Sequence, residues 1–189
     1  MRIGTGDRYE IMRNGRFMRY HNITYEDMLN GDGLRVVLWV AGCEHGCEGC
    51  QNPVTWNPED GLEFDCEAME EIETELKKDY IAGITFSGGD PLHPSNIEKV
   101  REISELVREK YSDKTIWLYT GYSWEDIERS EEMFAAVRLC DVVVDGRFEK
   151  ALKENKYHWA GSTNQRIISV KRTLAEGKIV LHDDGGMTE

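Results

Sequence analysis

The sequence contains no apolar stretch long enough to cross a membrane. Its longest apolar run, VVLWVAG, covers residues 36–42, whereas a transmembrane helix needs roughly 20 consecutive apolar residues. The N-terminal segment MRIGTGDRYE mixes both charges and lacks the apolar core of a secretion signal. We therefore expect a cytoplasmic protein with no membrane partner.

The sequence also lacks any cluster of basic residues. Its 23 Lys and Arg residues stand against 36 Asp and Glu residues, which gives a net charge of −13. Binding to nucleic acid needs clustered Lys and Arg that contact phosphates, so we expect no nucleic-acid partner. Hydrophobic residues make up 40% of the chain and aromatic residues 10%, which excludes a disordered protein. A length of 189 residues suits a single folded domain.

Strand-like apolar segments alternate with helix-like segments along most of the chain. This alternation predicts a parallel sheet whose strands are joined by right-handed helical crossovers. At least four such strands in this length predict an α/β fold, a partial (open) (β/α) barrel with a mostly parallel sheet. The expected strands cover residues 35–41, 84–86, 115–120 and 141–144, followed by 166–170 and 178–181.

Helices are expected between these strands. Residues 66–80 show helical periodicity that places Tyr80 on the buried face. Ser95 and Glu98 form a capping-box pattern for a second helix. A third helix is expected over residues 124–140. Before the first predicted strand, turn signals favour short strands or loops.

Residues of unusual type follow the ends of the predicted strands. A cysteine cluster follows the first strand, Gly88-Gly89 the second, Gly121 the third, and the charged turn from Asp145 to Arg147 the fourth. Because the carboxyl ends of parallel strands meet at one edge of a sheet, we expect a functional site there. Paired glycines let the backbone approach a ligand closely, and the charged turn offers a carboxylate and a guanidinium. Ordinary tight turns use the same residue types.

Three of the five cysteines, Cys43, Cys47 and Cys50, form a C-x3-C-x2-C pattern. Thiolates at this spacing suit a zinc ion or an iron–sulfur cluster. A structural zinc ion takes four protein ligands. The sequence has no second C-x2-C pair, so the candidate for a fourth zinc ligand is His45, which lies within the motif. A [4Fe–4S] cluster on three cysteines would instead leave one iron open for catalysis.

Other notable side chains are expected to pack rather than react. Cys66 and Cys140 are interpreted as small core residues. Three histidines have no partner identifiable in the sequence, and these are His93, His158 and His182. Four tryptophans are interpreted as packing residues, namely Trp56, Trp117, Trp124 and Trp159.

The cysteine motif after the first strand of a partial barrel resembles the radical S-adenosylmethionine (SAM) enzymes. Many of these have an aromatic residue before the third cysteine, where this chain has Gly49. Residues 42–52, followed by Thr55-Trp56, are more similar to one subgroup, the activating proteins of the anaerobic (class III) ribonucleoside-triphosphate reductases. These are glycyl-radical activases. That family favours Cys-Pro-Gly-Cys-aromatic-Asn, so Glu48 and Gln51 depart from it.

Further segments resemble that family in the same order, namely residues 87–92, 119–122, 145–149 and 161–168. The similarity runs from near residue 20 to near residue 170. We therefore expect three parts in the chain. They are an N-terminal extension over residues 1–19, a radical SAM activase domain over residues 20–182 and a flexible C-terminal tail over residues 183–189.

The resemblance implies a cluster site and a neighbouring SAM site. The three motif cysteines would hold a [4Fe–4S] cluster, and the amine and carboxylate of SAM would chelate its open iron. The backbone of Gly49, Cys50 and Gln51 would lie against the nucleoside. The methionyl amine would be bound by the turn made of Gly88, Gly89 and Asp90.

Two later groups of residues complete the predicted site. Asp145 is a candidate for a ribose hydroxyl or the sulfonium charge of SAM, and Arg147 for a carboxylate. We assign one of two roles to Asn164, Gln165 and Arg166: they close the SAM site, or they dock the partner protein. No residue is expected to act as a general acid or base.

The function implied by the resemblance is reductive cleavage of SAM, followed by formation of a glycyl radical on the large reductase subunit. Reduced flavodoxin or ferredoxin is the expected class of electron donor. Two alternatives stay open at this point. One is another small radical SAM enzyme, such as a pyruvate formate-lyase-type activase or a deazaguanine-pathway synthase. The other is a non-catalytic zinc-binding module.

Overall fold

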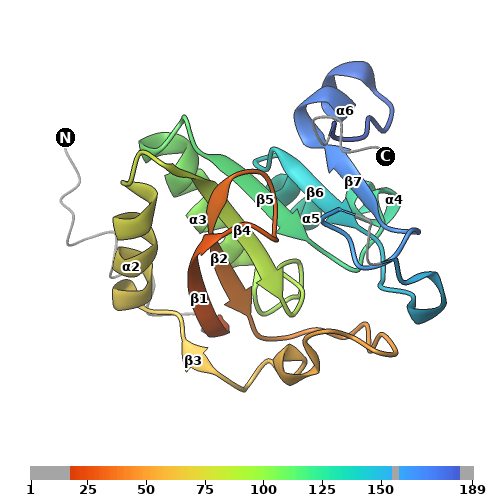
Figure 1. The fold of residues 1–189 in the computed structure, drawn as a ribbon, viewed down its shortest axis with the longest axis horizontal. Helices are drawn as coiled ribbons and strands as arrows, with labels where there is room; N and C mark the ends of the chain where they lie inside the picture. The colour runs from red at the N-terminus through yellow and green to blue at the C-terminus, as the bar shows by residue number, and fades with distance from the viewer. Residues whose placement is uncertain (1–17, 155–157, 184–189) are drawn as a thin grey trace.

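The computed structural model describes residues 18–154 and 158–183. They form an open seven-stranded sheet in the order β3-β1-β2-β4-β5-β6-β7, with helices packed against it (Figure 1). The strands are β1 (Arg19–Asp27), β2 (Leu34–Val40), β3 (Leu62–Glu63), β4 (Ile81–Gly88), β5 (Thr115–Tyr119), β6 (Val142–Asp145) and β7 (Arg166–Ser169). The helices are α2 (Cys66–Leu76), α3 (Ile97–Lys110), α4 (Trp124–Arg129), α5 (Glu131–Val137) and α6 (Val170–Glu176), with short 3-10 turns η2 (Pro53–Thr55) and η3 (Lys150–Leu152).

Strands β2, β4, β5 and β6 are parallel neighbours at the centre of the sheet. β1 is antiparallel to both β2 and β3, and β7 is antiparallel to β6. β1 and β7 therefore run opposite to the other five strands. The sheet ends at β3 and β7 without closing. The predicted α/β fold with an open, mostly parallel sheet is confirmed.

The two faces of the sheet have different partners because successive side chains of a strand point to opposite sides. On one face, Val36, Leu38 and Val40 of β2 join the main apolar core, together with the buried residues of α2, α3, α4 and α5. The other face carries a smaller cluster around Trp117 of β5. The helices thus cover one face and leave the other for a cleft.

Arg35 fills the helix-free face at the start of β2 and is fully buried. Its guanidinium donates to the hydroxyls of Thr85 and Thr115 at 2.7 and 2.9 Å, and to the carbonyls of Asp32, Ile84 and Thr115. It also lies 5.6 Å from the ring centroid of Trp117. These contacts join β2, β4 and β5 beneath the cleft.

The predicted helix over residues 124–140 is wrong in one respect, because it is two helices. Ser130 has an extended backbone with ψ of 112°, and its side chain accepts a hydrogen bond from the backbone N–H of Met133. Its hydroxyl therefore caps a new helix, α5, and ends α4. The helical spacing of apolar residues in the sequence does not by itself reveal such a break.

Three further predictions about local structure are wrong. Helix α2 ends at Leu76, and Tyr80 is 54% exposed, with its hydroxyl donating to Glu26. The capping box does not form, because α3 begins after Asn96 and the hydroxyl of Ser95 bonds Asn96 and His93 instead. Residues 178–181 form only a single bridge, between Leu181 and Ile168 of β7.

The segment before the first predicted strand also differs from expectation, because residues 19–27 form the long strand β1. This strand begins inside the predicted extension, and Met18 is buried beside it. Residues 1–17 and 184–189 lie outside the described residues, so the extension and the tail stay predictions. Within the described ranges, no helix is long and apolar enough to cross a membrane.

Candidate active site

A cleft of about 590 Å³ opens at the carboxyl ends of β2, β4 and β5. Predicted site residues that line it are Cys43, Cys47, Cys50, Gln51, Gly88, Gly89, Asp90 and Gln165. Predicted site residues that do not line it are Gly49, Asp145, Arg147, Asn164 and Arg166. The strand ends therefore meet as expected, while the later charged residues lie elsewhere.

The loop that carries the three cysteines is closed at its base by backbone hydrogen bonds. Gly42 N–H donates to the carbonyl of Thr55 at 2.7 Å, and Cys43 N–H donates to that of Trp56 at 3.0 Å. Gly42 has a φ of +103°, and a Cβ there would lie 2.9 Å from the hydroxyl of Ser95. The chain can leave β2 along this path because residue 42 has no side chain.

The three cysteines suit an iron–sulfur cluster. All three are partly exposed to the same cleft, and none forms a disulfide. Asn52 N–H lies 3.3 Å from Cys50 Sγ, a contact that stabilises a thiolate ligand. Thiolates are soft ligands that iron–sulfur clusters use. Cys43, Cys47 and Cys50 would therefore hold the cluster.

The same loop does not form a site for a single metal ion. Among the described residues, no three His, Cys, Asp or Glu side chains gather closely enough to hold one ion. A cluster places its cysteine ligands on separate irons and does not require them to meet at one centre. His45, the candidate fourth ligand of a zinc site, places its Nε2 2.6 Å from the carboxylate of Asp90.

Burial raises the pKa of the Cys43 thiol to about 11, and a hydrogen bond from the backbone of His45 offsets part of the rise. Cys43 is consequently a protonated thiol in the metal-free protein at neutral pH. Since the ligand is the thiolate, loading iron at this loop has to release that proton.

Asp90 connects the cysteine loop to β5 and lies almost completely buried. Its carboxylate accepts hydrogen bonds from the hydroxyl of Thr120 at 3.0 Å and from Gly121 N–H at 2.9 Å. The imidazole Nε2 of His45 lies 2.6 Å from the same carboxylate. Asp90 therefore faces protein groups on at least two sides, which the sequence did not indicate.

The Gly88-Gly89 turn packs tightly against the end of β2. Gly89 N–H donates to Val40 and Asp90 N–H donates to Gly42, both at 2.7 Å. A Cβ at residue 89 would lie 2.5 Å from the carbonyl oxygen of Gly42. The N–H groups of Gly89 and Asp90 are therefore occupied within the protein, which leaves the carbonyl oxygens of the turn as candidate contacts for a ligand. Carbonyl oxygens accept hydrogen bonds and so suit an ammonium group.

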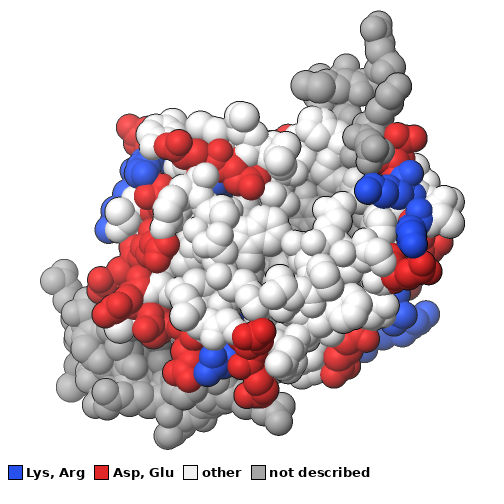
Figure 2. Space-filling model, turned by 60° about the horizontal axis from the view of Figure 1, so that its bottom comes forward, with Lys and Arg blue, Asp and Glu red and all other residues white. Residues whose placement is uncertain are grey.

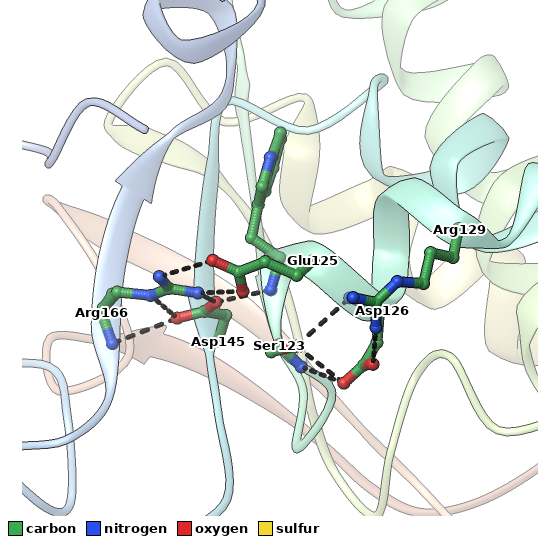
Figure 3. Close-up of polar contacts among 7 residues, drawn as sticks. Ser123, Glu125, Asp126, Arg129, Asp145 and Arg166 are labelled. Carbon is green, nitrogen blue, oxygen red and sulfur yellow. Dashed lines mark hydrogen bonds and ion pairs between the residues drawn. The ribbon is translucent and has the colours of Figure 1, made fainter. Parts of the chain in front are cut away.

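Asp145 is buried in an ion pair with Arg166 (Figure 3). The Arg166 guanidinium donates to both carboxylate oxygens of Asp145, at 3.0 and 2.5 Å, and reaches Glu125 on the other side. Trp124 N–H donates to Asp145 at 2.7 Å, so the same carboxylate holds the first turn of α4. The predicted role of Asp145 in binding SAM is untested, but its polar contacts here are internal.

The neighbouring capping box in Figure 3 explains why α4 begins here. The hydroxyl of Ser123 donates to the Asp126 carboxylate at 2.7 Å, and Asp126 N–H lies 3.2 Å from that hydroxyl. Arg129 adds an exposed ion pair to Asp126 at 3.2 Å. Local capping and the Asp145 contact therefore both position this helix.

The segment after β6 closes one side of the cleft. Gln165 Nε2 donates to the carbonyl of Gly146 at 2.9 Å, and its Oε1 accepts from Gly161 N–H at 2.9 Å. Asn164 donates to the carbonyl of Arg147 at 2.8 Å. These side chains join two loops at this side of the cleft.

Several aromatic residues of the cleft were not assigned to it from the sequence. Trp117 and Trp124 are buried as expected, and Trp159 packs against Trp117 as expected, with ring centroids 5.0 Å apart. Trp159 also lines the cleft, and so does the partly exposed Trp56, which was interpreted as a packing residue. Alternation along the strands would have indicated Trp39 and Tyr119, because both point away from the helix-covered face. The aromatic residues that line the cleft are Trp39, Trp56, Tyr119, Phe148, His158 and Trp159.

Two other interpretations are corrected. Cys66 is exposed at the start of α2, although Cys140 is buried as predicted. His93 and His182 do have partners: His93 bonds Ser95, and His182 Nε2 lies 2.7 Å from Asp32. Ser95 is only two residues from His93, whereas Asp32 is 150 residues from His182.

Comparison with known proteins places these observations in a family. A family model described as a 4Fe-4S single cluster domain matches residues 29–168. The anaerobic ribonucleoside-triphosphate reductase-activating protein of Enterobacteria phage T4 is 44% identical over 152 residues, covering 80% of this chain and 94% of that protein. The chain belongs to the family of anaerobic ribonucleoside-triphosphate reductase-activating proteins. The members from Vibrio cholerae and Escherichia coli K12 are 38% and 37% identical, each covering 79% of this chain and 97% of its relative.

Membership of the reductase-activating family confirms the predicted family, its class of activating enzyme and its iron–sulfur domain. Among solved structures, QueE from Escherichia coli matches 61% of this chain and 57% of its own with a TM-score of 0.44 and 12% identity. That similarity is too low to support an argument about the site. The assignment rests on the sequence relatives and on the iron–sulfur domain.

Proposed function

We propose that this member of the reductase-activating family is a radical SAM activase. The observation that supports the proposal most directly is the position of Cys43, Cys47 and Cys50 in one cleft with the Gly88-Gly89 turn. The chemistry that a bound [4Fe–4S] cluster and SAM supply is one-electron cleavage to methionine and a 5′-deoxyadenosyl radical, which takes a hydrogen atom from a glycine of the reductase.

The chain's own residues bind and orient the reactants. The three cysteines would supply thiolate ligands, and the carbonyl oxygens of the Gly88-Gly89 turn would accept the methionyl ammonium group. The backbone of Gly49, Cys50 and Gln51 would lie along the nucleoside. Residue 49 has a φ of +74°, which suits glycine at this bend.

The surroundings of the cleft support a protein substrate. The side chain of Trp56, which lines the cleft, is 37% exposed, and Leu29 on the β1–β2 connection is 80% exposed. Figure 2 shows a face whose centre is largely uncharged and whose edge carries charged side chains of both signs. We propose that the large reductase subunit presents its glycine loop here, and that reduced flavodoxin or ferredoxin supplies the electron.

The closing segment is assigned a supporting role. Gln165 links the Gly146 and Gly161 loops and lines the cleft, so it would help to hold SAM in place. Asn164, Arg147, Arg166 and Asp145 would act by shaping this segment. The direct contacts with SAM that were predicted for Asp145 and Arg147 are therefore secondary to this shaping role.

The test is anaerobic reconstitution with iron and sulfide, followed by reduction, addition of SAM and measurement of 5′-deoxyadenosine. Cys43→Ala, Cys47→Ala and Cys50→Ala should each abolish product. Cys66→Ala is the matched control, because Cys66 is an exposed cysteine outside the cleft, and it should retain full activity. A colourless protein that binds zinc and leaves SAM intact would overturn the proposal.

A further inference from the structure

His45 lies between two of the motif cysteines, yet its side chain points away from solvent. The imidazole is 6% exposed, and its Nε2 lies 2.6 Å from the carboxylate of Asp90. Its ring also packs edge-on against Tyr122, with ring centroids 4.7 Å apart. The middle of the cysteine loop is thus anchored to residues that follow β4 and β5.

Asp90 is itself fixed by several donors. Leu92 N–H, the Thr120 hydroxyl and Gly121 N–H all donate to its carboxylate at 2.8 to 3.0 Å. A carboxylate held on this many sides has little freedom to move toward a ligand. It is therefore a rigid acceptor for His45.

Gly121 provides the space that the imidazole occupies. A Cβ built at residue 121 would lie 2.3 Å from Cδ2 and 2.5 Å from Nε2 of His45. The backbone of Gly121 is not in the left-handed region, so the turn itself does not require glycine there. The absence of a side chain at this position is explained by the contact with His45.

We propose that His45 is a positioning residue that locks the cysteine loop to Asp90 and Gly121 and thereby sets the distance between the cluster and the Gly88-Gly89 turn. Asp90 directly follows that turn, so one carboxylate joins the cluster side and the SAM side of the cleft. The inference rests on the proposed function, because it assumes that the loop carries a cluster and that SAM binds beside it.

The proposal predicts a defect in SAM binding rather than in cluster ligation. His45→Asn removes the reach to Asp90, whereas His45→Gln keeps an amide nitrogen near the position of Nε2. Gly121→Ala displaces the imidazole without changing it. His182→Ala is the control, since His182 Nε2 also lies 2.7 Å from a carboxylate, that of Asp32, but this pair is more exposed and lies outside the cysteine loop.

The measurement is a SAM titration of the reduced, reconstituted protein, followed by the change in the electron paramagnetic resonance spectrum of the cluster. Loss of a hydrogen bond to a buried charged group should weaken SAM binding about tenfold in His45→Asn and Gly121→Ala. His45→Gln and His182→Ala should bind SAM as the unchanged protein does. Iron and sulfide content should stay the same in all four variants.

A second readout uses the metal-free protein. Amide hydrogen exchange over residues 43–50 should be faster in His45→Asn and in Gly121→Ala than in His45→Gln. Equal SAM binding and equal exchange in the Asn and Gln variants would overturn the positioning role. An unchanged protein that assembles no iron–sulfur cluster would instead contradict the proposed function, so the two failures are distinguishable.

Discussion

Arg166 holds two carboxylates at once, the buried Asp145 and the exposed Glu125. The side chain of Asp145 is 1% exposed, and that of Glu125 is 48% exposed. Both are ion pairs with the same guanidinium (Figure 3). The two ion pairs differ in burial, so their contributions to the free energy of unfolding should differ strongly.

Asp145→Asn should lower the free energy of unfolding by about 3 kcal/mol, because it leaves a partly buried guanidinium without its closest partner. Glu125→Gln is the matched control and should cost at most about 1 kcal/mol, since solvent screens an exposed pair. Urea denaturation of the metal-free protein measures both. If Asp145→Asn weakened SAM binding with unchanged stability, Asp145 would be a ligand contact instead.

Asp141 should make stability depend on pH at low pH. Burial raises the pKa of Asp141, but hydrogen bonds from Lys171 and Arg108 outweigh it and lower the pKa below its ordinary value of 3.8. Their nitrogens lie 2.7 and 2.6 Å from the carboxylate. A depressed folded pKa contributes stability above the ordinary value, and that contribution is lost as pH falls through the folded value.

The comparison for Asp141 is with Asp141→Asn, which cannot ionise. The unfolding free energies of the two proteins should differ at pH 7 and converge as pH falls below 3.8. Denaturant titrations at several pH values measure the difference. A constant difference across that range would show that the ion pairs do not stabilise the charged form.

Arg35→Lys should destabilise the sheet although it keeps the positive charge. A lysine ammonium cannot match the guanidinium that bonds Thr85, Thr115 and three carbonyls, so a loss of about 3 kcal/mol is expected. Arg19→Lys is the control, because Arg19 bonds Gly61 and Glu63 at the edge of the sheet. It should cost less than about 1 kcal/mol by urea denaturation. Equal losses of unfolding free energy in the two variants would contradict the expectation that the buried arginine contributes more to stability than the one at the sheet edge.

Gly89→Ala should disrupt the contact between the Gly88-Gly89 turn and the cysteine loop. The added Cβ would lie 2.5 Å from the carbonyl oxygen of Gly42 and 3.0 Å from that of Thr55, both backbone atoms. We expect lower iron content after reconstitution and a loss of 5′-deoxyadenosine formation. Gly177→Ala is the control: its positive φ of 65° makes alanine cost about 1 kcal/mol, but nothing lies within 4 Å. Its iron content should be normal.

The central strands and the cysteine loop were predictable because their signals are local. Buried parallel strands appear as runs of β-branched residues, and a C-x3-C-x2-C triplet brings its ligands together by spacing alone. Helix boundaries were less predictable. The break at Ser130 depends on which of two local hydrogen-bonding patterns its hydroxyl adopts, and apolar periodicity is the same for both.

The partners of the charged residues were not predictable, because they come from distant parts of the chain. Asp145 and Arg166 are 21 residues apart, and His45 and Asp90 are 45 apart. Nothing in either local sequence indicates the other partner. The sheet order brings them together, since β6 pairs with β7 and β2 with β4.

The sequence by itself determined the class of this protein: an α/β fold, a three-cysteine loop after the first parallel strand, and the ordered motifs of a reductase-activating family. Short-range chemistry and hydrophobic periodicity were enough for that. Only the tertiary structure decided that Asp145 faces Arg166, that Asp90 faces His45, and that Gly121 makes room for the imidazole. Those relationships depend on buried contacts between strand ends, where the packing of neighbouring loops selects the partner of each polar group.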